Sequence, residues 1–399
     1  KQFTQELRLT SDYADSPVNF LIGGFYQDGN IKVRNRLRAN TAFGLPPLLM
    51  SGLHDVDIKS ISAFGQLLWQ VTENIEIAGG ARWTDEERNH KFTDILAGGI
   101  NVVPPVPELN SDNVSPELSI TYTPTDSLTL FASYREGFKS GSFNTVVSAT
   151  PTTRADFGDE KAKGGEAGLK TVLLDGSMTL NVAGYYYKYS DLQVGANDLT
   201  ASGAIALRTI NAATAIVKGI EADFAYNVSA LPGLSLHGAV NYNRARYDEF
   251  GNAPCGNGQT IAEGCNQLFN ETTGLFTSQD LSGVALVRAP DWTANFGFDY
   301  ETPIGNGMLL AFGATTRYSD DYYTNLTAQP LYIQDDYFKT SATVALRSAD
   351  DAWEVALIGN NLSNEITTGN CSNGNTGNGT IFGGQIAGGV NKGPAGDDE

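Results

Sequence analysis

The chain has 399 residues and a formal net charge of −19, and this length suits two or three soluble domains or one large barrel. Its 44 glycines, 17 tyrosines and 19 phenylalanines are typical of strands and turns. The negative charge argues against a nucleic-acid partner, because binding to phosphates requires basic patches. The sequence has no apolar run of about 18 residues, which excludes a membrane-spanning helix. A membrane strand is not excluded, because it shows lipid only alternate residues.

Strand-like runs follow one another along the whole chain. We predict about 14 of them, many near the ~9–11 residues that a tilted strand needs to cross a bilayer. They cover 2–11, 18–27, 56–70, 74–87, 114–123, 127–136, 165–174, 177–193, 214–226, 234–247, 291–302, 308–318, 336–347 and 352–362.

The connections between these runs alternate in length. Short turns occur at 72–73, 124–126, 175–176 and 305–307, and most carry turn-forming residues. Between them come long polar links, at 28–55, 88–113, 137–164, 194–213, 248–290, 319–335 and 363–399. A barrel with tight turns at one rim and long loops at the other predicts this pattern, whereas a soluble sandwich gives no reason for it.

Within the runs, apolar and polar residues alternate with a period of two, as a soluble sheet with one wet face would also show. The aromatic residues favour a membrane, because the apolar series ends in Trp or Tyr on both sides. These residues are Trp83, Tyr134, Tyr186 and Tyr242 towards the long links, and Trp69, Tyr122, Tyr226 and Tyr300 towards the short turns. Two aromatic rings of this kind are typical of two lipid–water interfaces.

The polar phase of the runs carries charges of both signs near strand centres, where lipid would make them costly. We therefore expect these residues to face a polar, water-accessible interior. They are Glu6, Arg8, Glu76, Arg82, Glu117, Glu166, Lys170, Glu221, Asp223, Asp299, Lys339, Arg347 and Glu354.

Three cysteines occur, all in the long links. Cys255 and Cys265 lie close together in a polar, glycine-rich stretch, which predicts a disulfide in an oxidising compartment. Cys371 has no visible partner.

Motifs for covalent chemistry are missing from the sequence. His54, His90 and His237 lack the spacing of a metal site, and no nucleophile elbow, phosphate loop or Cys-x-x-Cys occurs. His237 lies on the polar phase of its strand, as a hydrated wall residue would. Paired acids such as Asp320–Asp321 could bind Ca²⁺, although acids that flank loops and turns are more often only solvated. We expect neither an enzyme nor a cofactor or metal centre.

Several stretches, in order, resemble the TonB-dependent outer-membrane receptors. They are 2–9 with 20–26, 63–66 with 79–86, 115–118 with 130–141, 189–192, 211–213 with 218–221, 289–292 and 359–364. The closest stretch reads Leu-Phe-Ala-Ser-Tyr-Arg-Glu-Gly-Phe-Lys-Ser-Gly, from Leu130 to Gly141.

The resemblance implies an all-β, transmembrane, antiparallel up-and-down barrel of 22 strands, with a plugged lumen. Residues 1–399 would form one partial barrel domain holding strands 8 to 21. The start carries no signal peptide and enters in mid-pattern. The signal peptide, the plug with its TonB-contacting segment, the early strands and the closing strand are then expected to be absent from this sequence.

One segment on the loop side, 135–143, mixes two cations with two aromatics and could hold an anionic, aromatic ligand. Its candidate residues are Arg135, Phe138, Lys139 and Phe143. The simpler alternative is that Arg135 pairs with an acid on the neighbouring wall while the aromatics pack the loop. Tyr322 and Tyr323, with Tyr332, form a weaker candidate group.

The expected function is active uptake of a scarce ligand across the bacterial outer membrane, most simply a ferric siderophore, with energy from the TonB complex acting on the plug. The expected surroundings are outer-membrane lipid and lipopolysaccharide. Two other functions remain open. A passive porin would lack a plug, and a surface all-β binding protein would be soluble without detergent.

Overall fold

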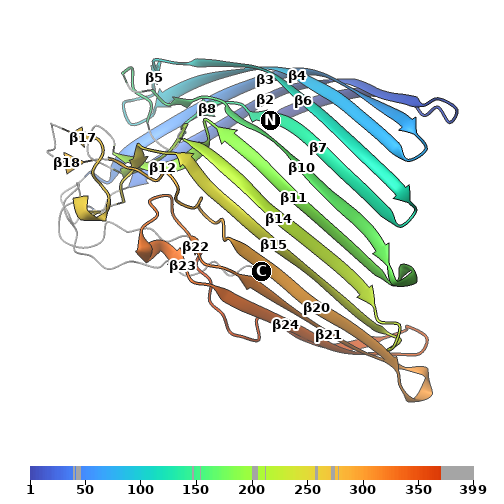
Figure 1. Ribbon diagram of the computed structural model, residues 1–399. Helices are drawn as coiled ribbons and strands as arrows, with labels where there is room; N and C mark the ends of the chain where they lie inside the picture. Colours follow the sequence, from blue (N-terminus) through green and yellow to red (C-terminus); the bar gives the residue numbers. More distant parts are fainter. Residues whose placement is uncertain are drawn as a thin grey trace.

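The computed structural model describes residues 1–38, 41, 46–145, 148–152, 154–199, 205–211, 213–256, 259–270, 275–276 and 278–369. In this part of the chain one large antiparallel sheet dominates, and it bends along its whole width (Figure 1). The segment with Cys371 lies outside the described residues.

Fourteen long strands pair in chain order, each with the next. They are β1 (Gln2–Thr10), β2 (Val18–Arg38), β3 (Leu48–Thr72), β4 (Ile75–Asp94), β6 (Glu108–Thr125), β7 (Leu128–Lys139), β10 (Glu160–Leu173), β11 (Met178–Ser190), β14 (Thr214–Asn227), β15 (Leu234–Glu249), β20 (Trp292–Pro303), β21 (Leu309–Ser319), β24 (Tyr337–Arg347) and β25 (Glu354–Gly359). A short strand, β5 (Ile100–Val102), adds to β4. The predicted all-β wall of about 14 up-and-down strands is confirmed.

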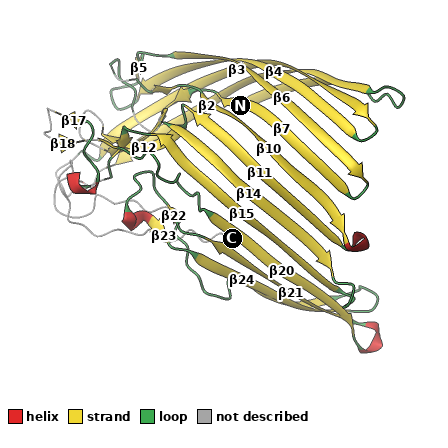
Figure 2. Cartoon of the chain, in the orientation of Figure 1, coloured by secondary structure: helices red, strands yellow, loops and turns green. Residues whose placement is uncertain are grey.

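The two rims of the sheet differ as the link lengths predicted. Figure 2 shows tight turns at one rim and long connections at the other. At the tight rim, Asn306 and Gly307 have φ of 64° and 74° in the turn between β20 and β21. Asn and Gly are the residues that adopt this left-handed backbone at least cost, so the sequence supports the turn directly.

The long connections contain small hairpins of their own. They pair β8 (Ser142–Phe143) with β9 (Asp156–Phe157), β12 (Gln193–Leu199) with β13 (Ile205–Asn211), β16 (Ala253–Pro254) with β19 (Ser278–Gln279), β17 (Phe269–Asn270) with β18 (Leu275–Phe276), and β22 (Tyr322–Tyr323) with β23 (Ile333–Gln334).

Strands β2, β3, β4 and β6 extend furthest beyond their predicted ends on the loop side. The link expected at 28–55 is largely strand, because β2 continues to Arg38 and β3 begins at Leu48. The link at 88–113 is likewise shortened by β4 and β6. Charged residues such as Lys32 and Asp55 take the outward phase of these extensions, while apolar residues such as Val56 and Phe92 are buried on the inward phase. This is the reverse of the outward apolar series used to predict strands. Cross-strand ion pairs stabilise the outward face, including Lys32 with Asp55 at 2.9 Å.

One face of the wall keeps its large apolar side chains exposed. Ile120 is 45% exposed and Val240 is 41% exposed, on β6 and β15 respectively. The predicted aromatic residues of both rings include Trp69, Trp83 and Tyr186, all exposed on this same face. No helix among the described residues is long and apolar enough to cross a membrane. The exposed apolar band between two aromatic rings is what lipid requires of a barrel exterior.

Buried apolar residues gather on the loop side of the sheet. One cluster contains Tyr247, Phe250, Ala253, Leu281 and Leu326, and side chains of the β12–β13 hairpin pack against it. In the same region Cys255 and Cys265 form a disulfide, with Cα atoms 5.5 Å apart. The long connections between β15 and β24 therefore have a packed core of their own.

Candidate functional site

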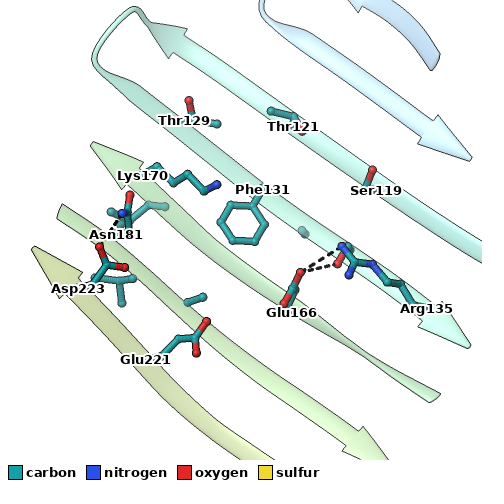
Figure 3. A pocket seen from close by; sticks show the side chains of 15 residues that line it. Ser119, Thr121, Thr129, Phe131, Arg135, Glu166, Lys170, Asn181, Glu221 and Asp223 are labelled. Atoms are coloured by element: carbon teal, nitrogen blue, oxygen red, sulfur yellow. Dashed lines mark hydrogen bonds and ion pairs between the residues drawn. The ribbon is translucent and has the colours of Figure 1, made fainter. Parts of the chain in front are cut away.

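The inner face of the wall contains a polar hollow of about 550 Å³, lined by side chains from β6, β7, β10, β11 and β14 (Figure 3). Its position follows from the period of two, which places every second residue of each strand on this face. The polar-phase residues Glu166, Lys170, Glu221 and Asp223 all line it. Four of the thirteen charges predicted to face the interior thus lie together on this concave surface.

Arg135 forms an ion pair at the loop-side end of this hollow. Its Nη2 lies 3.3 Å from Oε1 of Glu166, which also accepts a hydrogen bond from Ser133 (Figure 3). Glu117 is opposite Arg135 in the β6–β7 register. Arg135 is still 56% exposed, so the guanidinium pairs with the wall and faces the interior at the same time.

The turn-side end of the hollow combines a cation with an aromatic ring. The Lys170 ammonium lies 5.8 Å from the centre of the Phe131 ring. That ring lies over Gly168, where a Cβ would be 2.9 Å from it. Nearby, Asn181 donates a hydrogen bond to Asp223 at 2.9 Å. This surface can contact both aromatic and charged groups of a ligand.

Lys139 lies further towards the loops and is also paired. Its Nζ is 2.9 Å from Oε2 of Glu160, and the same carboxylate accepts a hydrogen bond from the backbone N–H of Gln193. The Gln193 side chain donates to the carbonyls of Lys139 and Ser140. Lys139 thus lies where the β12–β13 hairpin joins the ends of β7 and β10.

The two predicted phenylalanines do not share the surface of these cations. Phe138 has the opposite strand phase to Arg135 and Lys139, and it is paired in register with Lys161 on β10. Phe143 is only 5% exposed and belongs to a cluster with Val56 and Ile58. The structure therefore brings together Arg135 and Lys139 on one face, and not the whole predicted segment.

Tyr322 and Tyr323 lie in the short strand β22, apart from β7 in the sheet order. Both are half-buried. Burial raises the pKa of the Tyr322 hydroxyl, and the neighbouring Tyr337 adds to this. The carbonyl of Tyr323 accepts a hydrogen bond from the backbone N–H of Arg288 at 2.8 Å.

Sequence reasoning missed one buried pair, His54 and His90. The register of β3 and β4 brings them together above the outer aromatic ring, with Nδ1 of His54 2.9 Å from Nε2 of His90. The pair depends on the register of β3 and β4, which the sequence alone did not give. Within the described residues, no group of three or more His, Cys, Asp or Glu is placed to hold a metal ion.

Residues 1–362 match the sequence family described as "TonB dependent receptor-like, beta-barrel". The chain belongs to the TonB-dependent receptor family. It is an outer-membrane protein, and the predicted family and location are both confirmed.

Similar proteins include the pesticin receptor of Yersinia enterocolitica, 25% identical over 222 residues, which are 55% of this chain and 30% of that protein. The solved ferric yersiniabactin uptake receptor FyuA of Yersinia pestis has a TM-score of 0.72 at 18% identity, covering 94% of this chain and 51% of that one. The solved siderophore receptor PiuA of Acinetobacter baumannii has a TM-score of 0.66 at 17% identity, covering 92% of this chain and 52% of that one. The chain thus spans about half the length of these solved structures.

Proposed function

We propose that this chain forms part of the wall of a receptor that takes up a ferric siderophore with TonB-derived energy. Family membership supports the receptor role. The siderophore is supported by similar proteins, which include a ferric yersiniabactin uptake receptor and a siderophore receptor. In this proposal the TonB complex acts through a plug domain of the whole receptor.

The observation that carries the proposal is the chemistry of the concave face. Arg135 and Lys139 lie at its loop-side end, and Arg82 lies 5.3 Å from the centre of the Phe64 ring lower on the wall. A ferric siderophore is often both anionic and aromatic. Cations attract the anionic groups, and an arginine stacked on a ring presents a flat surface to aromatic ones.

Uptake by intact cells tests this function. The full-length receptor is expressed in a strain lacking its own siderophore receptors, and radioactive iron uptake is measured with a panel of ferric siderophores. We expect uptake of at least one chelate, saturating with concentration and lost when TonB is deleted. Uptake that continues without TonB would support a passive porin instead, and no uptake of any chelate would reject the siderophore.

The inner-face cations give a sharper version of this test. The double variant Arg135→Gln, Lys139→Gln should raise the KM for uptake, because neutral side chains attract the anionic chelate less. Arg347→Gln is a matched control, since Arg347 is on the same phase but pairs with Glu354 at the tight-turn rim. An equal rise in KM in the double variant and in Arg347→Gln would show that the loop-side cations have no special role in attracting the chelate.

A further inference from the structure

Four adjacent strands carry a cation at the same place on the outer face. On each strand it is the next outward residue beyond the outer aromatic ring, on the loop side of Gly165, Tyr186, Ile220 or Tyr242. The cations are Lys163 on β10, Lys188 on β11, Lys218 on β14 and Arg244 on β15. We call these four residues the cationic row; their strands lie side by side in Figure 1.

The register places like charges directly opposite one another. Lys163 pairs with Lys188, and Lys218 pairs with Arg244. Directly opposed like charges destabilise a sheet, and this protein, with a net charge of −19, has an ample supply of acids. Because these cations do not stabilise the sheet, we look for their role in a contact with another molecule.

The wall neutralises only a small part of this charge. Lys188 contacts Asp248 at 3.2 Å. Glu136 is opposite Lys163 in register, and it accepts a hydrogen bond from the Tyr134 hydroxyl at 2.6 Å. Among the described residues, Lys163, Lys218 and Arg244 form no ion pair within 4.0 Å. All three of these side chains are exposed.

Other sectors of the wall lack this feature. On β4 the next outward residue beyond Trp83 is Asp85, and it is opposite Asp112 on β6. Asp112 accepts a hydrogen bond from the Trp83 indole N–H at 2.9 Å. At the same height, then, the sector of β4 and β6 is acidic and the sector from β10 to β15 is basic.

We propose that the cationic row binds the lipid A phosphates of a lipopolysaccharide molecule in the outer leaflet. The aromatic ring marks the lipid–water interface, and two further residues rise roughly 7 Å along a strand. This is the level at which headgroup phosphates meet long cationic side chains, which reach to the interface from an apolar surface. The inference rests on the outer-membrane location and not on the proposed siderophore.

The full-length receptor tests the site. In one variant, called the row variant, all four residues of the cationic row are replaced by Gln. The matched control removes three lysines and one arginine from the outward face of β2, β3 and β4, at Lys32, Arg34, Lys59 and Lys91. Native mass spectrometry then counts the lipopolysaccharide retained after purification in mild detergent.

We expect retained lipopolysaccharide to fall about tenfold or more in the row variant, because each cation near an anionic lipid contributes several-fold in affinity. The control should retain the wild-type amount. The wild-type protein should bind lipid A and bind dephosphorylated lipid A much less. Wild-type retention by the row variant, or equal binding of the two lipids, would overturn the proposal.

A stability measurement separates binding from a structural role. In detergent free of lipopolysaccharide, the row variant should unfold at the same temperature as the wild type or higher, because like-charge repulsion has been removed. Added lipopolysaccharide should then raise the unfolding temperature of the wild type only. A row variant that unfolds at a lower temperature without lipid would show that the cations serve the wall itself, and would also overturn the proposal.

Discussion

His54 and His90, on neighbouring strands, form one hydrogen-bonded pair in a buried site on the loop side of the wall. Their rings stack with centroids 5.2 Å apart, and the two residues are 0% and 2% exposed. The ring of Phe143 lies 4.8 Å from that of His90 and encloses the site. A hydrogen bond between two imidazoles needs one neutral acceptor nitrogen, so this geometry requires at least one ring to be uncharged.

Acid should therefore loosen this end of the wall. Burial lowers the pKa of His90 below its usual 6.5. As the pH falls below that value, the unfolded segment takes up a proton that the folded one resists, so the stability present at higher pH is lost. Hydrogen exchange of the β3 and β4 extensions between about pH 5 and 8 should show this change. His90→Phe should flatten the profile, and an unchanged profile would contradict the assignment to His90.

Phe143→Ala should destabilise the same region. Removing a buried phenylalanine side chain typically costs about 3–5 kcal/mol, and here it would also open the histidine pair to water. Protection of the loop-side amides of β3 and β4 reports the loss. Phe138→Ala is the matched control, because Phe138 is only half-buried and should cost clearly less. An equal loss of amide protection in the two variants would contradict the packing of Phe143 in the buried cluster.

A charge on the outer face should be far more harmful than one on the inner face. Val240→Arg puts a guanidinium among the outward apolar residues, where a charge costs about 2–4 kcal/mol at the bilayer midplane and less towards the interface. Asn241→Arg, at the next residue of β15, points to the polar interior and should be tolerated. Folding yield in lipid vesicles compares the two variants. Equal tolerance would mean that the two faces are not lipid and water.

Reducing the disulfide should affect the long connection after β15 and leave the wall intact. The bond between Cys255 and Cys265 closes a short loop, and such bonds typically contribute about 2–4 kcal/mol. Reductant should speed proteolysis within this connection while the strands stay protected. The double variant Cys255→Ser, Cys265→Ser should be cleaved at the faster rate with or without reductant. Cleavage within β15 or β20 on reduction would show a wider role.

The wall itself could be predicted from the sequence because lipid imposes a simple rule on each strand. Residues 127–136 and 234–247 alternate so regularly that their positions as β7 and β15 needed no other information. The loop-side ends of β2 and β3 could not be found this way. There Lys32 and Asp55 pair on the outward face while Val56 is buried on the inward one, so the pairing depends on register and not on an outward apolar series.

The candidate site was only partly predictable. The sequence offered, as the simpler alternative, an ion pair of Arg135 with an acid on the neighbouring wall, and Glu166 is that acid. The sequence could not show that the side chains of Phe138 and Phe143 lie away from the surface that carries Arg135. Strand phase places Phe138 on the other face, and the chain after β7 folds back to bury Phe143 against β3 and β4.

Spin labels along β15 test the arrangement of the two faces most directly. Single cysteines are introduced from Leu236 to Tyr242 in the full-length receptor, with Cys371 replaced by Ser, and each labelled protein is placed in lipid vesicles. If the outer face meets lipid, accessibility to oxygen should peak at positions 236, 238, 240 and 242, and accessibility to a water-soluble nickel chelate at 237, 239 and 241. Labels at 236 and 240 that are shielded from both probes would show that protein covers this face, and would contradict a membrane wall.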